Sequence, residues 1–496
     1  MSHPDTRGVR ICRALIAIPI LILAALSAHA QQKTPDPMEA AAGTKLEEII
    51  VTGSRIARPD LERLQPTTVI SARTLDDRGY TEVGQALNEL PGFGVPPSSS
   101  ANTQSAFGIA QSFVDLYSLG SQRTLTLVNG RRFVSSNTPS LNGPTNPGQQ
   151  VDLNVIPTKL IERIETISVG GAPIYGADAI SGTVNIILKK NFSGFDLDAQ
   201  AGTSSRSDAS SAAVRALGGH NFAGGRGNVT VVGEYSKASG LYGTARSNYA
   251  SDLGFLAPLT PGKYDNVLTP ANSVPSINYS GIPMVDDVFF APAFGLDPAI
   301  FGITQGSTVL AFQPLSSALQ PYNLGKQTGN PIFWEGGDGL RLSQVSNLLS
   351  PIDRLNLDTV ANFKIGENTN LFAEGWFSQT HSTNLLAQPA YNTALFGSAG
   401  TAYGNFIVKI SNPFLSDIDR ALIQDAVNNY GALVGPGGTA DPNWRSDQFY
   451  LTRASVDLQS GRATARQVLA RGVVGIEGKF ALGKRNFNWE IAANYG

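Results

Sequence analysis

Few residues of the kinds that carry catalysis or hold metals stand at useful spacings in this chain. Beyond residue 30 the histidines are His220 and His381, about 160 positions apart, and neither lies beside a second ligand at metal spacing. The glycine-rich residues 224–227 lack the spacing and the following helix of a dinucleotide site. The sequence also has no G-x-S-x-G turn and no P-loop, and nothing in it pairs two carboxylates as acid and base. We therefore predict a protein without catalysis, without a metal site and without a cofactor.

A segment suited to backbone pairing lies near the N-terminus. Residues 31–45 are polar and contain two prolines, which predicts a flexible tether. An acidic pair, a run of β-prone residues and a glycine follow: Glu47, Glu48, Ile49, Ile50, Val51, Thr52 and Gly53. Such a segment pairs readily as an extended strand. It either adds to the sheet edge of a partner or forms the first strand of the next domain, and the segment alone leaves both open.

Residues 1–30 have the pattern of a secretory signal peptide. Three arginines precede an apolar run at residues 14–26, and Ala28-His29-Ala30 fits a cleavage site after Ala30. The run is short for a membrane span and is interrupted by Pro19. The single cysteine, Cys12, lies inside this segment, so the mature chain would contain no disulfide.

Composition narrows the class of protein further. The net charge is only −2, so the chain lacks the basic character of a nucleic-acid partner. Glycine accounts for 52 residues, charged residues for 15%, and no apolar stretch after residue 30 is long enough for a membrane helix. An outer-membrane barrel and a secreted soluble all-β protein both fit this composition.

Residues 54–190 predict one compact α/β domain. A helix is expected over residues 82–90, where Pro91-Gly92 ends it, and a second helix from Pro157 through Arg163. Strands are expected at residues 124–128, 164–169 and 183–190. Asn129-Gly130 predicts a type I′ hairpin turn because both residues tolerate positive φ.

From residue 194 onward apolar and polar residues alternate, which predicts strands. About eight are expected, near residues 195–202, 211–219, 227–236, 354–365, 370–380, 448–458, 466–482 and 487–495. Segments of this length match transmembrane β-strands, and the long aperiodic stretch 241–353 favours large extracellular loops over a soluble sandwich. An eight-stranded barrel could not enclose the preceding domain, so we predict that the sequence is part of a chain roughly twice as long.

Four segments, in order along the chain, resemble TonB-dependent outer-membrane receptors. The resemblance to the TonB box and the junction after it is carried by residues 47–56 (EEIIVTGSRI). The resemblance to the plug domain is carried by residues 122–132 (QRTLTLVNGRR), 151–165 (VDLNVIP and IERIE within it) and 170–190 (GGAPIYGADAISG, then VNIILKK).

The resemblance implies an α+β plug domain followed by the first part of an antiparallel transmembrane β-barrel. It divides the chain into a signal peptide (1–30), a periplasmic tether with the TonB box (31–53), the plug (54–190) and barrel strands (191–496). The implied function is active transport of a scarce ligand across the outer membrane, with the plug gating the barrel. The implied partners are the TonB energy-coupling protein, outer-membrane lipid and an extracellular ligand, a ferric siderophore or another large nutrient.

The same resemblance suggests which side chains act. We expect salt bridges from the plug to the barrel wall at Arg123, Arg131, Arg132, Glu162, Arg163 and Glu165. We expect ligand contacts at Phe107, Phe113, Asn137, Asn142, Asn146 and Gln149, in the segments 93–113 and 135–150. Charges that are merely solvated, and loops that are merely polar, are the alternatives. For the whole chain the alternatives are an outer-membrane adhesin or structural barrel without transport, and a non-functional fragment.

Overall fold

The computed structural model describes most of the chain from residue 67 onward. The described residues are 67–94, 111–136, 150–168, 172–256, 267–285, 302–313, 318–328, 333–345, 347–385, 390–391, 406–434, 445–454, 462–483 and 485–496. All of them belong to one compact unit. No helix among them is long and apolar enough to cross a membrane.

The first part of this unit is a domain built on a five-stranded mixed sheet in the order β1-β6-β7-β4-β5. We call residues 67–188 the N-terminal domain. β4 and β7 are parallel and the other neighbours are antiparallel. The strands are β1 (Thr67–Ser71), β4 (Thr124–Val128), β5 (Arg131–Arg132), β6 (Ile161–Ile167) and β7 (Gly182–Leu188).

Two short helices, α3 (Ala72–Asp77) and α4 (Val83–Asn88), follow β1. The Ser71 hydroxyl caps α3 by accepting a hydrogen bond from the Thr74 N–H. α4 confirms the helix predicted over residues 82–90, and it buries Val83, Ala86 and Leu87 in the domain core. Short elements complete the domain: the β2–β3 pair (Phe93–Gly94, Asp115–Leu116), α5 (Ala172–Tyr175) and 3₁₀ turns.

The hairpin turn predicted at Asn129-Gly130 is confirmed. Both residues have positive φ, +50° and +77°, which is the requirement of a type I′ turn. The Asn129 side-chain oxygen accepts a hydrogen bond from the Leu188 N–H (3.0 Å), and the Asn185 side-chain oxygen accepts one from the Gly130 N–H (2.9 Å). β7 therefore fixes the turn that joins β4 to β5.

The helix predicted from Pro157 through Arg163 is wrong. Only Thr158–Leu160 form a 3₁₀ turn, and β6 begins at Ile161. The register between β6 and β7 shifts between Ile161 and Arg163, which is a β-bulge. The extra residue brings Ile161 and Ile164, three positions apart, into the same buried core. A bulged strand thus produced the spacing of a helix face.

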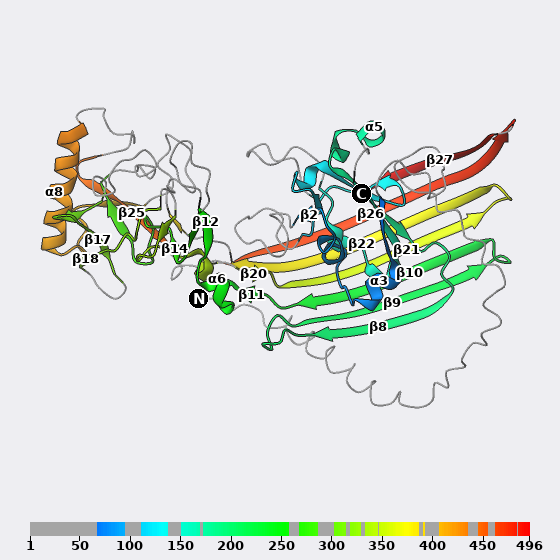
Figure 1. The fold of residues 1–496 in the computed structure, drawn as a ribbon, viewed down its shortest axis with the longest axis horizontal. Coiled ribbons are helices and arrows are strands. Elements are labelled where there is room, and N and C mark those ends of the chain that lie inside the picture. The colour runs from blue at the N-terminus through cyan, green and yellow to red at the C-terminus, as the bar shows by residue number, and fades with distance from the viewer. Residues whose placement is uncertain are drawn as a thin grey trace. The chain divides into compact units, whose positions relative to one another are not determined.

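The second part of the unit is a seven-stranded antiparallel sheet, which we call the long sheet (Figure 1). Every strand pairs with the next member along the chain. The strands are β8 (Gly194–Gly202), β9 (Ser211–Phe222), β10 (Gly227–Ala238), β21 (Ile352–Lys364), β22 (Thr369–Leu385), β26 (Arg462–Leu482) and β27 (Arg485–Tyr495).

Connections of different length alternate between the two ends of the long sheet. Residues 223–226, 365–368 and 483–484 make the connections at one end, which we call the short-turn end. Residues 203–210, 239–351 and 386–461 make the connections at the other end. This up-and-down alternation is the connectivity of a meander, and it is typical of outer-membrane barrels.

The two faces of the long sheet have the reverse of the usual polarity. Polar side chains such as Glu234, Asn356 and Arg471 are at most 4% exposed. Apolar side chains on the other face are open, Leu357 at 49% and Val474 at 60%. We call these the inner and outer faces. A soluble sheet buries its apolar face, so this arrangement fits a sheet with lipid on its outer face and protein on its inner face.

Seven of the eight strands predicted after residue 194 lie in the long sheet, and the placement of the eighth is wrong. The segment predicted at residues 448–458 forms β25 (Gln448–Ala454). It pairs with β15 (Ile282–Met284), β23 (Ala390–Tyr391) and β24 (Phe406–Lys409) instead. Alternation specifies a strand, but not the sheet that receives it.

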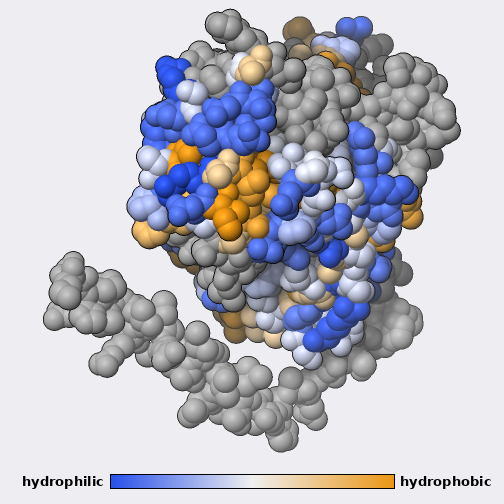
Figure 2. Space-filling view, turned by 90° about the vertical axis from the view of Figure 1, so that its left-hand side faces the viewer, coloured by the Kyte–Doolittle hydropathy of each residue, from blue (hydrophilic) through white to orange (hydrophobic). Residues whose placement is uncertain are grey.

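The described parts of the two longest connections, within residues 239–351 and 386–461, pair with each other, and we call them the loop lobe. β15 comes from the first connection and β25 from the second, and they are paired. The lobe also holds α8 (Asp417–Val434), the strands β16 (Thr304–Gln305), β17 (Thr308–Phe312) and β18 (Leu319–Pro321), and a core of its own. The smaller strand pairs are β11 (Leu241–Tyr242) with β20 (Asn347–Leu349), β12 (Gly254–Leu256) with β13 (Val267–Thr269), and β14 (Asn272–Ser273) with β19 (Trp334–Glu335). Figure 2 shows an apolar patch surrounded by hydrophilic residues on one face of the molecule.

Candidate functional site: the contact between the N-terminal domain and the long sheet

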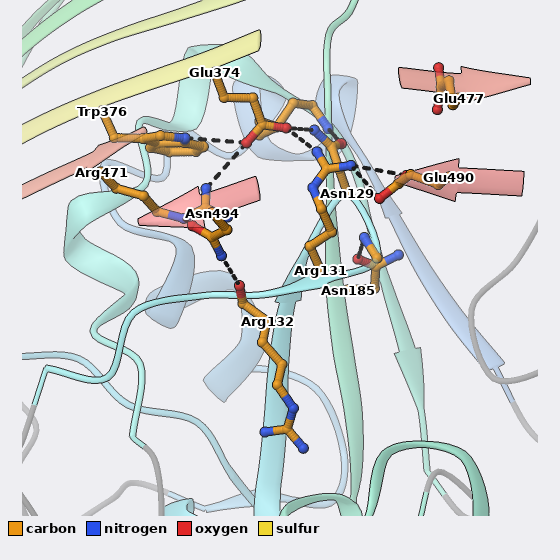
Figure 3. Close-up of polar contacts among 12 residues, drawn as sticks. Asn129, Arg131, Arg132, Asn185, Glu374, Trp376, Arg471, Glu477, Glu490 and Asn494 are labelled. Atoms are coloured by element: carbon orange, nitrogen blue, oxygen red, sulfur yellow. Dashed lines mark hydrogen bonds and ion pairs between the residues drawn. The ribbon is translucent and has the colours of Figure 1, made fainter. Parts of the chain in front are cut away.

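The β4–β5 hairpin presents a positive charge to the inner face of the long sheet (Figure 3). Arg131 pairs through its guanidinium with Glu374 of β22 and, at 3.2 Å, with Glu490 of β27. Asn129, at the turn, donates a hydrogen bond to the same Glu374 oxygen at 2.8 Å. The Arg131 side chain is 14% exposed and the Glu374 side chain 2% exposed, so the contact is largely closed to water.

The second carboxylate oxygen of Glu374 is held by the long sheet itself. It accepts hydrogen bonds from Arg471 at 3.2 Å and from the Trp376 indole N–H at 3.3 Å. The Arg471 guanidinium lies 4.6 Å from the centre of the Phe133 ring, which belongs to the N-terminal domain. Glu374 therefore bonds both sides of the contact at once.

Two arginines and two glutamates balance in this cluster, so the contact carries no net charge. Asn494 joins it by accepting a hydrogen bond from Arg471 (3.0 Å) and donating one to the Arg132 backbone carbonyl (3.2 Å). Removing one member of such a buried set costs about 3–5 kcal/mol, because an unpaired charge stays behind.

A second polar cluster on β9, β10 and β21 holds the backbone of the N-terminal domain. Glu234 accepts hydrogen bonds from the Thr158 N–H (3.1 Å) and hydroxyl (3.3 Å). Arg215 donates to the Tyr80 carbonyl (3.2 Å), and Arg354 donates to the Thr81 carbonyl (2.9 Å). Apolar contacts accompany these polar clusters: Phe133 packs edge-on against Trp376 with ring centroids 5.2 Å apart, and Leu217 and Val232 of the long sheet are buried against the core of the N-terminal domain.

Asp152 is a buried carboxylate inside the N-terminal domain, in the segment 151–157 that the sequence singled out. One oxygen accepts hydrogen bonds from the Ser112 N–H (2.9 Å) and the Asn154 N–H (3.0 Å). Burial raises the pKa of Asp152 to about 6, and the two N–H groups oppose that rise. The carboxylate ties segments that are 40 positions apart.

Of the six plug charges named from the sequence, the structure brings Arg131 to charged partners on the long sheet. Arg132 pairs with Asp178, and Arg163 pairs with Glu162 (3.0 Å) and Glu165 (2.8 Å), all within the N-terminal domain. Arg123 donates to the Leu119 carbonyl. These ion pairs join segments within the N-terminal domain.

Sequence reasoning missed the partners on the long sheet and one further lysine. Glu374, Glu490 and Arg471 were not singled out, and Lys159 pairs with Asp196 of β8 at 3.0 Å. A signal existed in the alternation of β27, which puts Glu490 on its polar face. The alternation could not say which charges of the other domain would face that position.

The predicted ligand contacts are mostly beyond the described residues. This holds for Phe107, Asn137, Asn142, Asn146 and Gln149, and also for the whole TonB box, Glu47, Glu48, Ile49, Ile50, Val51, Thr52 and Gly53. Phe113 is described, and its side chain is only 1% exposed. It is buried in this conformation, and the ligand contact expected of it stays a prediction.

Residues 59–183 match the family model described as the TonB-dependent Receptor Plug Domain. Among solved structures the chain is similar to the ferric enterobactin receptor PfeA from Pseudomonas aeruginosa, with 13% identity, 87% of this chain and 42% of that chain covered, and a TM-score of 0.41. It is also similar to the siderophore receptors PirA from P. aeruginosa (11%, 86%, 49%, 0.34) and PiuA from Acinetobacter baumannii (11%, 90%, 47%, 0.36).

The chain spans less than half the length of each of these structures. The family match covers the domain that contains the β4–β5 hairpin and its contacts to the long sheet. Residues 59–183 of this chain are therefore a plug domain of the kind found in TonB-dependent receptors.

Proposed function

We propose that this chain serves TonB-dependent active transport of a scarce ligand across the outer membrane, with the plug as the gate. The single observation that carries the proposal is the charge-balanced cluster in which Arg131 and Arg471 pair with the buried Glu374, and Arg131 also pairs with the partly exposed Glu490. A gate must close firmly and still detach. Ion pairs and hydrogen bonds allow this, because the separated groups form hydrogen bonds to water instead. Exposing apolar surface to water has no such compensation.

The same proposal places the long sheet in the outer membrane. Its exposed apolar face would meet lipid, and its buried polar face meets the plug. The domain scheme belongs to this proposal too: a signal peptide at 1–30, a periplasmic tether with the TonB box at 31–53, the plug at 54–190, and barrel strands from 191. The predicted longer chain would supply the remaining strands.

Energy would enter at the TonB box. TonB would add a strand along Ile49 to Thr52, and the force would reach the plug through the tether. The source is the proton gradient of the inner membrane, worth about 2.3 kcal/mol per charge per 100 mV. Beyond the box, β1 is the first described strand, and it pairs only with β6 at one edge of the plug sheet.

A proline in the box tests this coupling. Ile50→Pro removes a ladder N–H and fixes φ, so we expect uptake to be lost while ligand binding persists. Ala42→Pro in the tether is the matched control and should leave uptake intact. Normal uptake by the Ile50→Pro receptor would show that residues 47–53 are not the TonB box.

Among possible cargoes we propose a ferric siderophore first. The test is the transcript level in cells grown with ample iron and with an iron chelator. Strong induction by the chelator, followed by uptake of labelled iron chelates, supports this cargo. An unchanged transcript contradicts it and moves the search to other large nutrients, such as cobalamin or oligosaccharides.

A further inference from the structure

Four polar side chains form a straight row across the outer face of the long sheet. Lys237, Asp353, His381 and Arg466 stand on β10, β21, β22 and β26, and each is the direct pairing partner of the next. Adjacent strands lie about 4.8 Å apart, so the row extends over about 14 Å. The side chains of Lys237 and Asp353 are 62% and 38% exposed, and His381 and Arg466 are also exposed.

The row marks one boundary of the apolar band. Toward the short-turn end the same face carries Leu357 and Val474, and the band ends in the stacked pair Phe222–Phe363. Ten positions separate Gly227, opposite Phe222 and Phe363, from Lys237. That distance is about 33 Å along a strand, or about 23–27 Å across the membrane for a tilt of 35–45°. The apolar band of an outer-membrane barrel is about 25 Å tall.

The charges in the row therefore stand where lipid headgroups begin, on the side of the loop lobe. Lys237 pairs with Asp353 at 3.1 Å, and Arg466 donates to the Gln379 side chain at 3.2 Å. These contacts hold both cations close to the sheet. Arginine presents a planar fork of N–H donors that matches phosphate oxygens, and lysine adds a mobile point charge.

We propose that Lys237, His381 and Arg466 bind the phosphate groups of a lipid headgroup in the leaflet on the loop-lobe side. The proposal rests on the placement of the long sheet in the membrane made under the proposed function. A rim of merely solvated charges is the alternative. The directly opposed positions favour a binding site, because they bring donors from three strands within reach of one diphosphorylated headgroup. Asp353, between Lys237 and His381, limits repulsion within the row.

The test uses the full receptor chain purified from outer membranes in mild detergent, with native mass spectrometry of retained diphosphoryl lipid A. We expect the K237Q/R466Q receptor to retain this lipid at least about tenfold more weakly, since two charge-assisted hydrogen bonds are lost. The matched control is R226Q. Arg226 lies at the opposite end of the band, with its guanidinium 5.5 Å from the centre of the Phe363 ring, and its loss should leave retention unchanged.

Several outcomes would overturn the proposal. One is equal retention by the natural receptor and the K237Q/R466Q receptor. Another is equal binding of lipid A from which the phosphates have been removed. A third is displacement of the lipid by millimolar inorganic phosphate, which would assign the row to a free anion. The amount of each variant in the membrane fraction is measured first. Absence of the natural receptor from that fraction contradicts the placement of the long sheet in the membrane. Loss of lipid by a variant that is present in the membrane supports lipid binding by the row.

Discussion

At the scale of single residues, the charge of Arg131 is neutralised by the long sheet and not by the plug that carries it. Glu374 is buried and Glu490 is partly exposed, at 2% and 38%. Arg471 also pairs with Glu374, so one carboxylate joins an arginine of the plug to an arginine of the sheet. Glu374 therefore links the plug to the long sheet in this cluster, as Glu234 does in the second cluster.

Glu374→Gln tests how much this carboxylate stabilises the docked plug. The substitution leaves two guanidinium groups without a buried counter-charge, and we expect it to destabilise the docked plug by about 3–5 kcal/mol. The mature chain would have no cysteine, so a single introduced thiol can be labelled selectively. We place it at Ile164→Cys, which is buried in the plug, and measure its labelling at increasing urea concentration. Labelling reports exposure of the plug interior. The midpoint should fall to lower urea.

Glu477→Gln is the matched control. Glu477 accepts a hydrogen bond from Asn370 of the neighbouring strand at 3.0 Å, and both residues belong to the long sheet. Its midpoint should stay near that of the natural receptor. Equal midpoints for the two variants would mean that Glu374 is not a main support of the closed state.

At the scale of elements, the Asn129-Gly130 turn positions the Arg131 guanidinium against the long sheet. Gly130 has a φ of +77°, and a Cβ built there meets nothing within 4 Å, so any cost of a side chain comes from the backbone alone. Gly130→Ala should destabilise the plug by about 1–2 kcal/mol and shift Arg131 from its partners. The same thiol-labelling midpoint measures this change.

Gly366→Ala provides the comparison. Gly366 lies in a short connection of the long sheet, where its Cβ would also meet nothing, and its φ is outside the left-handed range. The labelling midpoint of Gly366→Ala should equal that of the natural receptor. A Gly130→Ala midpoint as high as that of Gly366→Ala would show that the turn does not need its glycine.

Local chemistry explains which elements could be predicted. The Asn129-Gly130 turn and α4 depend on neighbouring residues, and both were found from the sequence. The β6 strand was misjudged because a bulge placed Ile161 and Ile164 three positions apart on one side. The pairing of Arg131 with Glu374 spans 243 positions, and it depends on sheet register and domain docking, which no local pattern contains.

At the scale of the whole molecule, the exposed apolar face predicts a response to charge that depends on depth. Leu357 is 49% exposed near the middle of the apolar band. Leu357→Arg should lower the stability of the inserted sheet by about 2–4 kcal/mol and reduce the amount of receptor in the outer membrane. Ile418→Arg, at a 75% exposed position of α8 in the loop lobe, should insert normally. Equal insertion of both variants would contradict a lipid-facing outer face.

The pairing of β15 with β25 has a consequence for the order in which the receptor is assembled. β15 lies before β21 and β22 in the chain, and β25 lies after them. The lobe sheet therefore cannot be completed until two strands of the long sheet and most of the second connection have been synthesised. A chain whose synthesis stops between residues 386 and 448 would leave β15 without β25, so the lobe forms late even though its first strands are made early.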